Sequence, residues 1–280
     1  MFEFVDNMMC FLYGSMACLG VFLITWFISV LIKNTGIVDI IWGLGFAIQA
    51  LVFYLTSKFQ ENFLWYRALF VALVVVHGLR LSIYILIRAI GKPEDKRYTE
   101  LFRNKYGGNF WWISLFTVFL FQLIINLIIG FPIFAFACSK RMTIENISYG
   151  IGMGIMFFGT VYETIADLQL YFFKKNPENK GKVLNRGLWF YSRHPNYFGE
   201  GVFWIGLYIV NISAGEYFTA FSPVIMIIFL LFVSGVSINE QFMKKNYSNE
   251  YKHYILSTSS YIPWCKKEVT NLDHDYEEKA

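Results

Sequence analysis

Long apolar runs alternate with short polar segments along nearly the whole chain. A helix needs roughly 20 mostly apolar residues to cross the hydrocarbon core of a bilayer. The runs do not alternate polar and apolar residues as the strands of a membrane barrel do, so they indicate helices. The sequence predicts seven membrane-spanning helices, at about residues 9–32, 37–57, 63–90, 110–138, 146–173, 198–213 and 217–238. The fourth is long enough to tilt or to break near Pro132.

Lysine and arginine gather in every second connection between these runs. The basic segments follow the third, fifth and seventh runs, at about 88–105, 174–193 and 244–267. An excess of Lys and Arg marks the cytosolic loops of membrane proteins. Seven helices place all three segments in the cytosol, with the N-terminus outside and the C-terminus inside. Six or eight helices would scatter the segments over both faces.

Composition supports a membrane protein. The chain is 56% hydrophobic and 16% charged, whereas soluble domains carry about a quarter charged residues. We therefore predict an all-α, polytopic integral membrane protein, in the endoplasmic reticulum of a eukaryote or the plasma membrane of a bacterium. Because no polar linker divides the chain, one membrane domain is expected over residues 1–264, followed by a polar cytosolic tail at 265–280. Glu3 and Asp6 occupy the place of a basic signal-peptide region, so the first run is expected to be retained.

Charge and cysteine spacing argue against other classes. A net charge of +4, with the basic residues in loops, gives no basic face for nucleic acid. The four cysteines show no CxxC spacing, so they indicate neither a metal site nor a disulfide framework.

Ionisable residues at membrane depth are costly and mark functional sites or internal pairs. Glu163 and Asp167 are four residues apart and share one face of a helix, where two carboxylates repel. They need basic side chains or ligand donors such as ribose hydroxyls as partners. Lys174 and Arg193 follow, and basic side chains of this kind contact phosphates. This pattern suits a nucleotide, although no GxGxxG is present to indicate a Rossmann site.

Five motifs together resemble a known family. They are "VDIIWGLGF", "GLRLSIYILIRAIGKPEDKRY", "ETIADLQLYFF", "GLWFYSRHPNYFGE" and "VSGVSINEQF…NEYKHYILSTSSYIPW". The combination resembles the steroid 5-alpha-reductase superfamily, and most closely its DUF1295 branch, over about residues 37–264. The RHPNYFG motif alone is not specific, because isoprenylcysteine carboxyl methyltransferases and related lipid methyltransferases carry RHPxYxG.

The resemblance implies a seven-helix membrane reductase that holds NADPH in a polar pocket open to the cytosol. Such enzymes transfer a hydride to a C=C bond of a hydrophobic enone or lipid, and a proton donor stabilises the developing enolate. The residues that match cofactor-facing positions of the family are Tyr84, Arg80, Glu163, Asp167, Lys174, Arg193, His194, Asn196, Tyr197, Glu200, Asn239 and Tyr247.

The chain departs from the steroid reductases on the substrate side. Aligning on Arg80 puts His77 where they have a tyrosine, and the nearest carboxylate on the second helix is Asp39. We therefore expect His77 to donate to the enolate oxygen, with Asp39 orienting it. The other interpretation is that His77 packs inside the third helix and Asp39 marks a helix start.

Two further classes stay open. An S-adenosylmethionine-dependent methyltransferase of a lipid or prenylated group would carry paired glutamates in the last helix, where this chain has Asn239 and Glu240. A transporter or scaffold would pair the polar cluster internally and bind no nucleotide.

Overall fold

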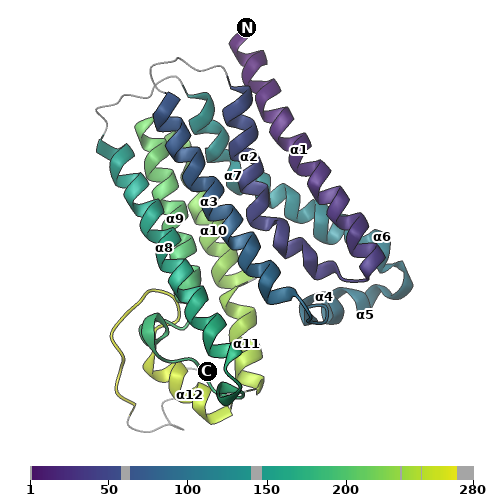
Figure 1. Ribbon diagram of the computed structural model, residues 1–280, viewed down its shortest axis with the longest axis vertical. Coiled ribbons are helices and arrows are strands. Elements are labelled where there is room, and N and C mark those ends of the chain that lie inside the picture. The colour runs from purple at the N-terminus through teal and green to yellow at the C-terminus, as the bar shows by residue number, and fades with distance from the viewer. Residues whose placement is uncertain (1, 58–63, 140–146, 234, 247, 270–280) are drawn as a thin grey trace. The chain divides into compact units, whose positions relative to one another are not determined.

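The computed structural model describes residues 2–57, 64–139, 147–233, 235–246 and 248–269. The regular structure of these residues is helical, apart from one isolated bridge between Ser192 and Ser259. This confirms the predicted all-α fold (Figure 1).

Six helical stretches of the described residues are long and apolar enough to cross a membrane: Val5–Ile32, Thr35–Thr56, Trp65–Ala89, Asn104–Cys138, Ile147–Lys175 and Tyr217–Lys245. They coincide with six of the seven predicted spans, and the chain is an integral multi-pass membrane protein. The predicted span at 198–213 is a helix, α9 (Pro195–Ser213), but it is not among the six. Its first half carries Asn196 and Glu200, which lower its hydropathy. The orientation stays a prediction.

The chain divides into two compact units. Unit 1 comprises Met1–Gly150 and Tyr208–Ser222, and unit 2 comprises Ile151–Leu207 and Pro223–Ala280. The long helices of unit 1 are α1 (Phe2–Ile32), α2 (Ile40–Thr56), α3 (Leu64–Ala89) and α7 (Phe121–Cys138). Within unit 1, α2 packs against α1, α3 and α7. Unit 1 also contains a short 3-10 helix, Tyr217–Ala220.

Glycines and buried amides bring the helices of unit 1 together. Gly43 on α2 and Gly78 on α3 face one another so closely that a Cβ on either would collide with the carbonyl of the other. Gln49 Nε2 donates to Asn126 Oδ1 across α2 and α7 over 2.9 Å. Small residues and interhelical hydrogen bonds are the usual means of helix association in membranes. The helix α7 runs on through Pro132, so of the two predicted alternatives, a tilt or a break, the break is not present.

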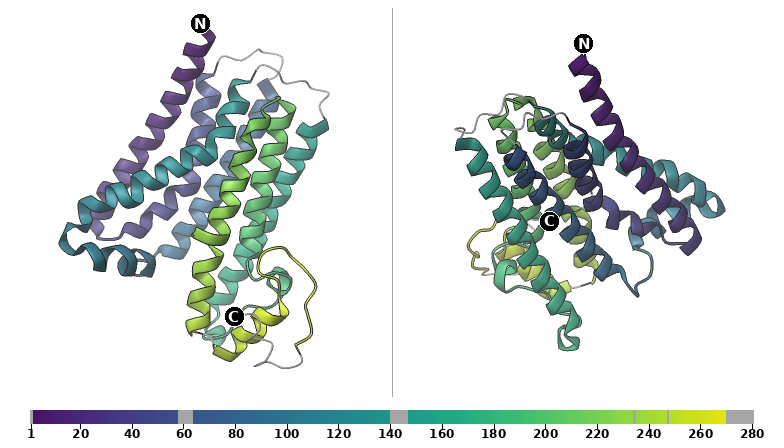
Figure 2. Two further views of the ribbon diagram at one scale, coloured as in Figure 1. Left: turned by 180° about the vertical axis from the view of Figure 1, so that it is seen from behind. Right: turned by 45° about the horizontal axis from the view of Figure 1, so that its top comes forward.

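Short helical segments connect the long helices of unit 1. They are a 3-10 turn at Thr35–Asp39, α4 (Lys96–Tyr98), a π-helical turn at Thr99–Arg103, α5 (Asn104–Tyr106), a 3-10 turn at Gly107–Asn109, α6 (Phe110–Ser114) and a π-helical turn at Leu115–Leu120. The segment from α4 to α6 lies at the end of the unit where α1 ends and α2 begins (Figure 2). Glu94 Oε2 accepts from Arg103 Nε over 2.7 Å, and Glu94 Oε1 accepts from the backbone N–H of Thr35 over 2.7 Å. Burial alone would raise the pKa of Glu94, but these donors outweigh it and lower that pKa.

Unit 2 holds most of the second half of the chain. Its elements are α8 (Ile147–Lys175) from Ile151 on, a 3-10 turn at Pro177–Asn179, a 3-10 turn at Gly187–Phe190, α9 up to Leu207, α10 (Phe221–Ile228) from Pro223 on, a π-helical turn at Phe229–Val233, α11 (Val236–Asn246) and α12 (Ser248–Ser257).

Glycines set the contact between α8 and α9. A Cβ on Gly159 would lie 2.6 Å from the backbone nitrogen of Phe203, and a Cβ on Gly206 would lie 2.6 Å from that of Met156. A Cβ on Gly199 would lie 2.7 Å from the backbone nitrogen of Glu163. As the contact residues rise along α9 they fall along α8, so the two helices are antiparallel.

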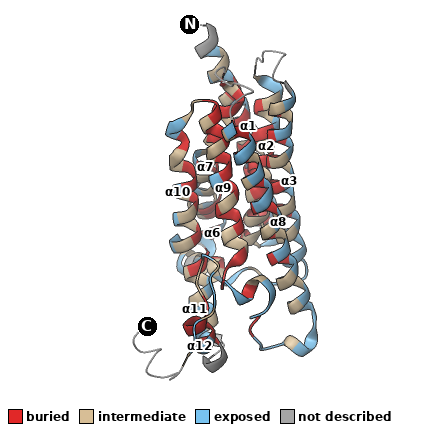
Figure 3. Cartoon of the chain, turned by 90° about the vertical axis from the view of Figure 1, so that its left-hand side faces the viewer, coloured by how far each residue is buried: buried red, intermediate tan, exposed pale blue. Residues whose placement is uncertain are grey.

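Exposed apolar side chains form a stripe along α8. Ile151, Phe158, Ile165 and Phe172 are 51%, 53%, 43% and 62% exposed and are spaced seven residues apart, which puts them on one helix face. Exposed and buried positions recur along the length of the helix (Figure 3). A stripe of large apolar groups suits contact with lipid chains, and it leaves the other face of α8 for buried polar groups.

Candidate functional site

The buried face of α8 carries the two carboxylates that the sequence singled out. Glu163 and Asp167 are 4% and 2% exposed. The missing side chain of Gly199 lets the start of α9 approach Glu163 closely. Asp167 Oδ1 accepts a hydrogen bond from Asn196 Nδ2 over 3.2 Å. The structure therefore joins α8 to the first turn of α9 through a carboxylate and an amide.

Asn196 has a buried acceptor left over. Its Oδ1 has no hydrogen-bond partner within the described residues, although the atom is shielded from solvent. Such atoms are uncommon in folded proteins and call for an explanation. The helix begins at Pro195, which has no N–H to lose, and the first N–H groups of a helix have no partner inside it. The start of α9 therefore offers an acceptor, Asn196 Oδ1, beside the backbone N–H donors of the first turn. A ligand that carries an amide or hydroxyl group could use both.

The first turn of α9 is also tied to α11. Tyr197 Oη accepts from Asn239 Nδ2 over 2.8 Å, and the Tyr197 ring stacks on His194 with centroids 5.6 Å apart. One turn further along α9, the buried Glu200 accepts from Trp204 Nε1 over 2.8 Å. The structure thus brings together most of the residues predicted in the RHPNYFGE motif.

Arg193 acts as a clamp, since its hydrogen bonds connect three segments of unit 2: its own loop before α9, α11, and the end of α12 with the residues that follow it. Its Nε and Nη2 donate to Glu240 Oε1 over 2.9 and 2.7 Å. Its Nη1 donates to the carbonyls of Ile255 and Thr258 over 3.0 and 2.6 Å. Its side chain is 8% exposed. These bonds engage most of the donors of the guanidinium. The structure therefore gives Arg193 a holding role in unit 2 that the sequence did not suggest.

His194 lies beside the same carboxylate. Its Nε2 is 3.4 Å from Glu240 Oε1, a contact that becomes an ion pair only when the imidazole is protonated. Burial lowers the pKa of His194, and the nearby Arg193 charge lowers it further, against the opposing effect of Glu240. The ring is therefore neutral near pH 7 and keeps its place by stacking on Tyr197.

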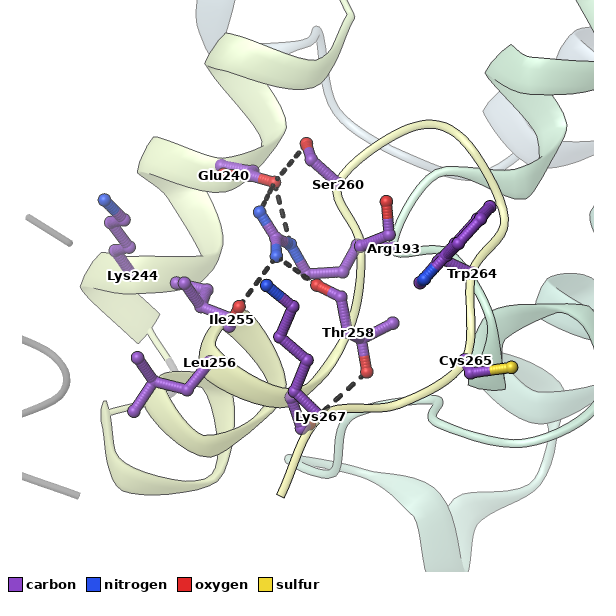
Figure 4. Close-up of a pocket in the computed structure, with 12 residues that line it drawn as sticks. Arg193, Glu240, Lys244, Ile255, Leu256, Thr258, Ser260, Trp264, Cys265 and Lys267 are labelled. Atoms are coloured by element: carbon purple, nitrogen blue, oxygen red, sulfur yellow. Dashed lines mark hydrogen bonds and ion pairs between the residues drawn. The ribbon is translucent and has the colours of Figure 1, made fainter. Parts of the chain in front are cut away.

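A cavity of about 490 Å³ opens beside the Arg193–Glu240 pair (Figure 4). Its wall includes Lys244 of α11, Lys267, Trp264 and the hydroxyl-rich run 257–260. The lining includes three basic side chains, Arg193, Lys244 and Lys267, and one carboxylate, Glu240, which pairs with Arg193. The volume of the cavity lies in the range of small-molecule sites. Its chemistry suits an anionic ligand.

The C-terminal segment belongs to the motifs that carry the resemblance, but the sequence predicted no role for its residues 254–261. Tyr254 Oη donates to the carbonyl of Trp189, and Ser192 Oγ donates to the carbonyl of Tyr261 over 2.8 Å. The run "STSSY" at 257–261 was the available signal, since a cluster of hydroxyls after an amphipathic helix can bind nearby backbone. Among the other predicted residues, Lys174 is exposed in the last turn of α8, and Tyr247 lies outside the described residues.

The predicted substrate-side residues His77 and Asp39 lie in unit 1, as do Arg80 and Tyr84, which were predicted to face the cofactor. His77, Arg80 and Tyr84 follow a three- and four-residue spacing on one face of α3. His77 is 2% exposed. The structure thus gives α3 a buried histidine with two further polar groups toward the C-terminal end of the helix.

Asp39 holds the connecting loop at α4, the first element of the segment from α4 to α6. Its Oδ2 accepts from Arg97 Nη2 and its Oδ1 from Tyr98 Oη, each over 2.7 Å. Burial and the Asp39 charge raise the pKa of Tyr98 well above its usual value, so the phenol keeps its proton and donates it. Both oxygens of Asp39 therefore hold this loop, and the orientation of His77 by Asp39 stays a prediction.

Comparison with known proteins was made on the sequence. The profile of the DUF1295 family, described as a protein of unknown function, matches residues 25–258. The probable O-methyltransferase ustE of Ustilaginoidea virens is 36% identical over 69 residues, which cover 25% of this chain and 24% of that protein. The chain thus matches about a quarter of the length of this curated relative. No solved structure matches the chain.

Proposed function

Because the chain belongs to the DUF1295 family, which points to membrane enzymes of the steroid reductase and methyltransferase type, we propose that it is an NADPH-dependent reductase. The substrate class is a C=C bond in a hydrophobic enone or lipid. The observation that carries the proposal is the pair of buried carboxylates Glu163 and Asp167 beside the half-buried Asn196, whose buried Oδ1 acceptor has no partner among the described residues.

The residues of unit 2 fit a dinucleotide. Asn196 Oδ1 would accept from the carboxamide of the nicotinamide, and the carboxylates of Glu163 and Asp167 would accept from ribose hydroxyls. Lys244 and Lys267, on the wall of the cavity, would neutralise phosphates. When bound, NADPH supplies the hydride. Arg193 and Glu240 would keep the walls of this site in place, since their hydrogen bonds join three segments of unit 2.

His77 is the proposed proton donor to the carbonyl oxygen of the substrate. A neutral imidazole can donate from one ring nitrogen while the other accepts, which suits a donor at an oxygen where charge develops. The variant His77→Phe tests this role. Turnover should fall by about 10²–10⁴-fold with NADPH binding retained, the usual contribution of general acid catalysis. Unchanged turnover would reject the role.

A methyl transfer from S-adenosylmethionine is the second candidate. The partial match to a probable O-methyltransferase favours it, as does the RHPNYFG motif. In this function the same cavity would receive the adenosine part of S-adenosylmethionine, which is cationic at sulfur. The basic side chains of Lys244 and Lys267 on the cavity wall suit phosphates better than a cationic ligand.

The experiment is a mass comparison of lipids. Membranes that contain the protein are incubated with NADPH or with S-adenosylmethionine, and extracted lipids are compared with those from membranes carrying Asp167→Asn. The reductase predicts a lipid that gains two hydrogens only with NADPH and only with the unaltered chain. A lipid that gains a methyl group with S-adenosylmethionine, with none gaining hydrogen, would overturn the proposal in favour of the second candidate.

A further inference from the structure

Two thiols from distant parts of unit 1 lie side by side. Cys10 is in the third turn of α1, and Cys138 is the last residue of α7. Their sulfur atoms are 3.8 Å apart although 128 positions separate them in the sequence. Both are free thiols, and no spacing motif marks them as a pair. The fold alone makes this pair.

The two sulfurs differ in what surrounds them. Cys10 is 2% exposed, receives a hydrogen bond from Thr56 Oγ1 over 3.1 Å and lies 3.8 Å from the carbonyl oxygen of Phe53. These contacts with the end of α2 hold its sulfur in position. Cys138 is partly exposed at the end of its helix. Cys138 is therefore more accessible to a reagent than Cys10, which is buried.

The two sulfur atoms are close enough for a change of side-chain rotamer to bring them to bonding distance. A disulfide has its sulfurs about 2.05 Å apart, so the pair must close by roughly 1.8 Å. A cysteine that changes from one staggered χ1 rotamer to the next moves its sulfur by about 3 Å. Rotation of one side chain therefore covers the distance.

We propose that Cys10 and Cys138 form an oxidisable dithiol, a modification site at which a reversible disulfide links α1 to α7. The oxidant is a small or protein disulfide. The Cys138 thiolate attacks it, which breaks its S–S bond, forms a mixed disulfide and releases one thiol. The Cys10 thiol then attacks the Cys138 sulfur and passes its proton to the departing thiolate, which leaves as the second thiol. Two protein thiols are oxidised and one external disulfide is reduced to two thiols.

The predicted orientation places this pair on the side of the membrane where such oxidants occur. With the N-terminus outside, the first turns of α1 lie near the outer face, and α7 ends at that face. The lumen of the endoplasmic reticulum and the bacterial periplasm favour disulfides. The inference is independent of the reductase function, because it concerns no residue of the proposed nucleotide site.

Oxidation of the purified full-length chain by glutathione redox buffers tests the proposal. After each incubation, free thiols are blocked with a maleimide, and the protein is digested and analysed by mass. We expect a peptide pair linked through Cys10 and Cys138 that disappears when dithiothreitol is added. The control is the Cys18→Ser variant, which alters a buried thiol of α1 that donates to the Gly45 carbonyl over 3.5 Å and should leave the linked pair intact.

The variants Cys10→Ser and Cys138→Ser give the second readout. With Cys10→Ser, Cys138 should stop at the mixed disulfide with glutathione, because nothing resolves it. With Cys138→Ser, Cys10 should stay unmodified. The absence of a linked pair in the unaltered chain, at buffer ratios that already add glutathione to the exposed Cys265, would overturn the proposal. So would a linked pair that involves Cys18.

Discussion

Replacing Arg193 with glutamine should destabilise unit 2, because the main role of Arg193 is to hold this unit together and not to contact a ligand. The side chain makes four hydrogen bonds, two to Glu240 and two to the carbonyls of Ile255 and Thr258. The carbonyl bonds contribute roughly 1 kcal/mol each, and the charged pair roughly 1.5–3 kcal/mol. The loss therefore comes to about 3–5 kcal/mol, which is the usual cost of removing one partner of a buried ion pair.

The assay is unfolding of the purified chain in detergent micelles, followed by tryptophan fluorescence. Arg186→Gln is the matched control, because Arg186 is an exposed arginine of the same basic segment. Glu240→Gln should lower the free energy of unfolding by a similar amount to Arg193→Gln, and the double variant by less than the two single losses together.

The reasoning fails if Arg193→Gln unfolds within about 1 kcal/mol of the control, the range of ordinary surface changes, and yet loses nucleotide binding. That result would make Arg193 a ligand contact, as the family resemblance implies, and would remove its role as a clamp.

Three further predictions concern the α8–α9 contact, the pH dependence of stability and the hydrogen bonds of Asp39. Gly159→Ala should lower the free energy of unfolding in detergent by about 1–3 kcal/mol, since its Cβ would meet the α9 backbone. Gly154→Ala is the control, because open space surrounds Gly154 and the variant should keep its stability. Equal effects of the two variants would contradict the α8–α9 contact. Because burial lowers the pKa of His194 between Arg193 and Glu240, the folded state disfavours its protonation. Thermal stability should therefore fall as pH drops below about 6.5 and be constant above it, and His194→Gln should reduce this slope. Asp39→Asn should lower the free energy of unfolding by about 1–3 kcal/mol, because Asp39 accepts hydrogen bonds from Arg97 and Tyr98 of α4. Unchanged stability with lost turnover would instead give Asp39 a part in the chemistry.

The apolar pattern predicted the membrane helices because burial in lipid requires long apolar runs. The run at 63–90 is α3, Leu64–Ala89, and the run at 146–173 is α8, Ile147–Lys175. Hydropathy alone does not show whether α9 spans the membrane. The polar first half of α9 packs against α8 through glycines and buried polar groups, so these positions do not need apolar, lipid-facing side chains. Local hydropathy does not report such packing.

The candidate site was predicted in part for a similar reason. The spacing of Glu163 and Asp167 places both on one helix face, and the structure buries both. The partners of Arg193 come from 47 to 65 residues further along the chain, so only the fold shows that its donors are engaged. The pairing of Cys10 with Cys138 is equally invisible in the sequence, because no spacing rule connects residues at the ends of two distant helices.

Direct binding of NADPH and of S-adenosylmethionine to the purified chain tests the central claim. Titration followed by nicotinamide fluorescence and by calorimetry gives both affinities in one preparation. The account predicts saturable NADPH binding that Asp167→Asn weakens at least tenfold and that Arg186→Gln leaves unchanged. Binding of S-adenosylmethionine without binding of NADPH would contradict the reductase, and binding of neither would contradict both candidate functions.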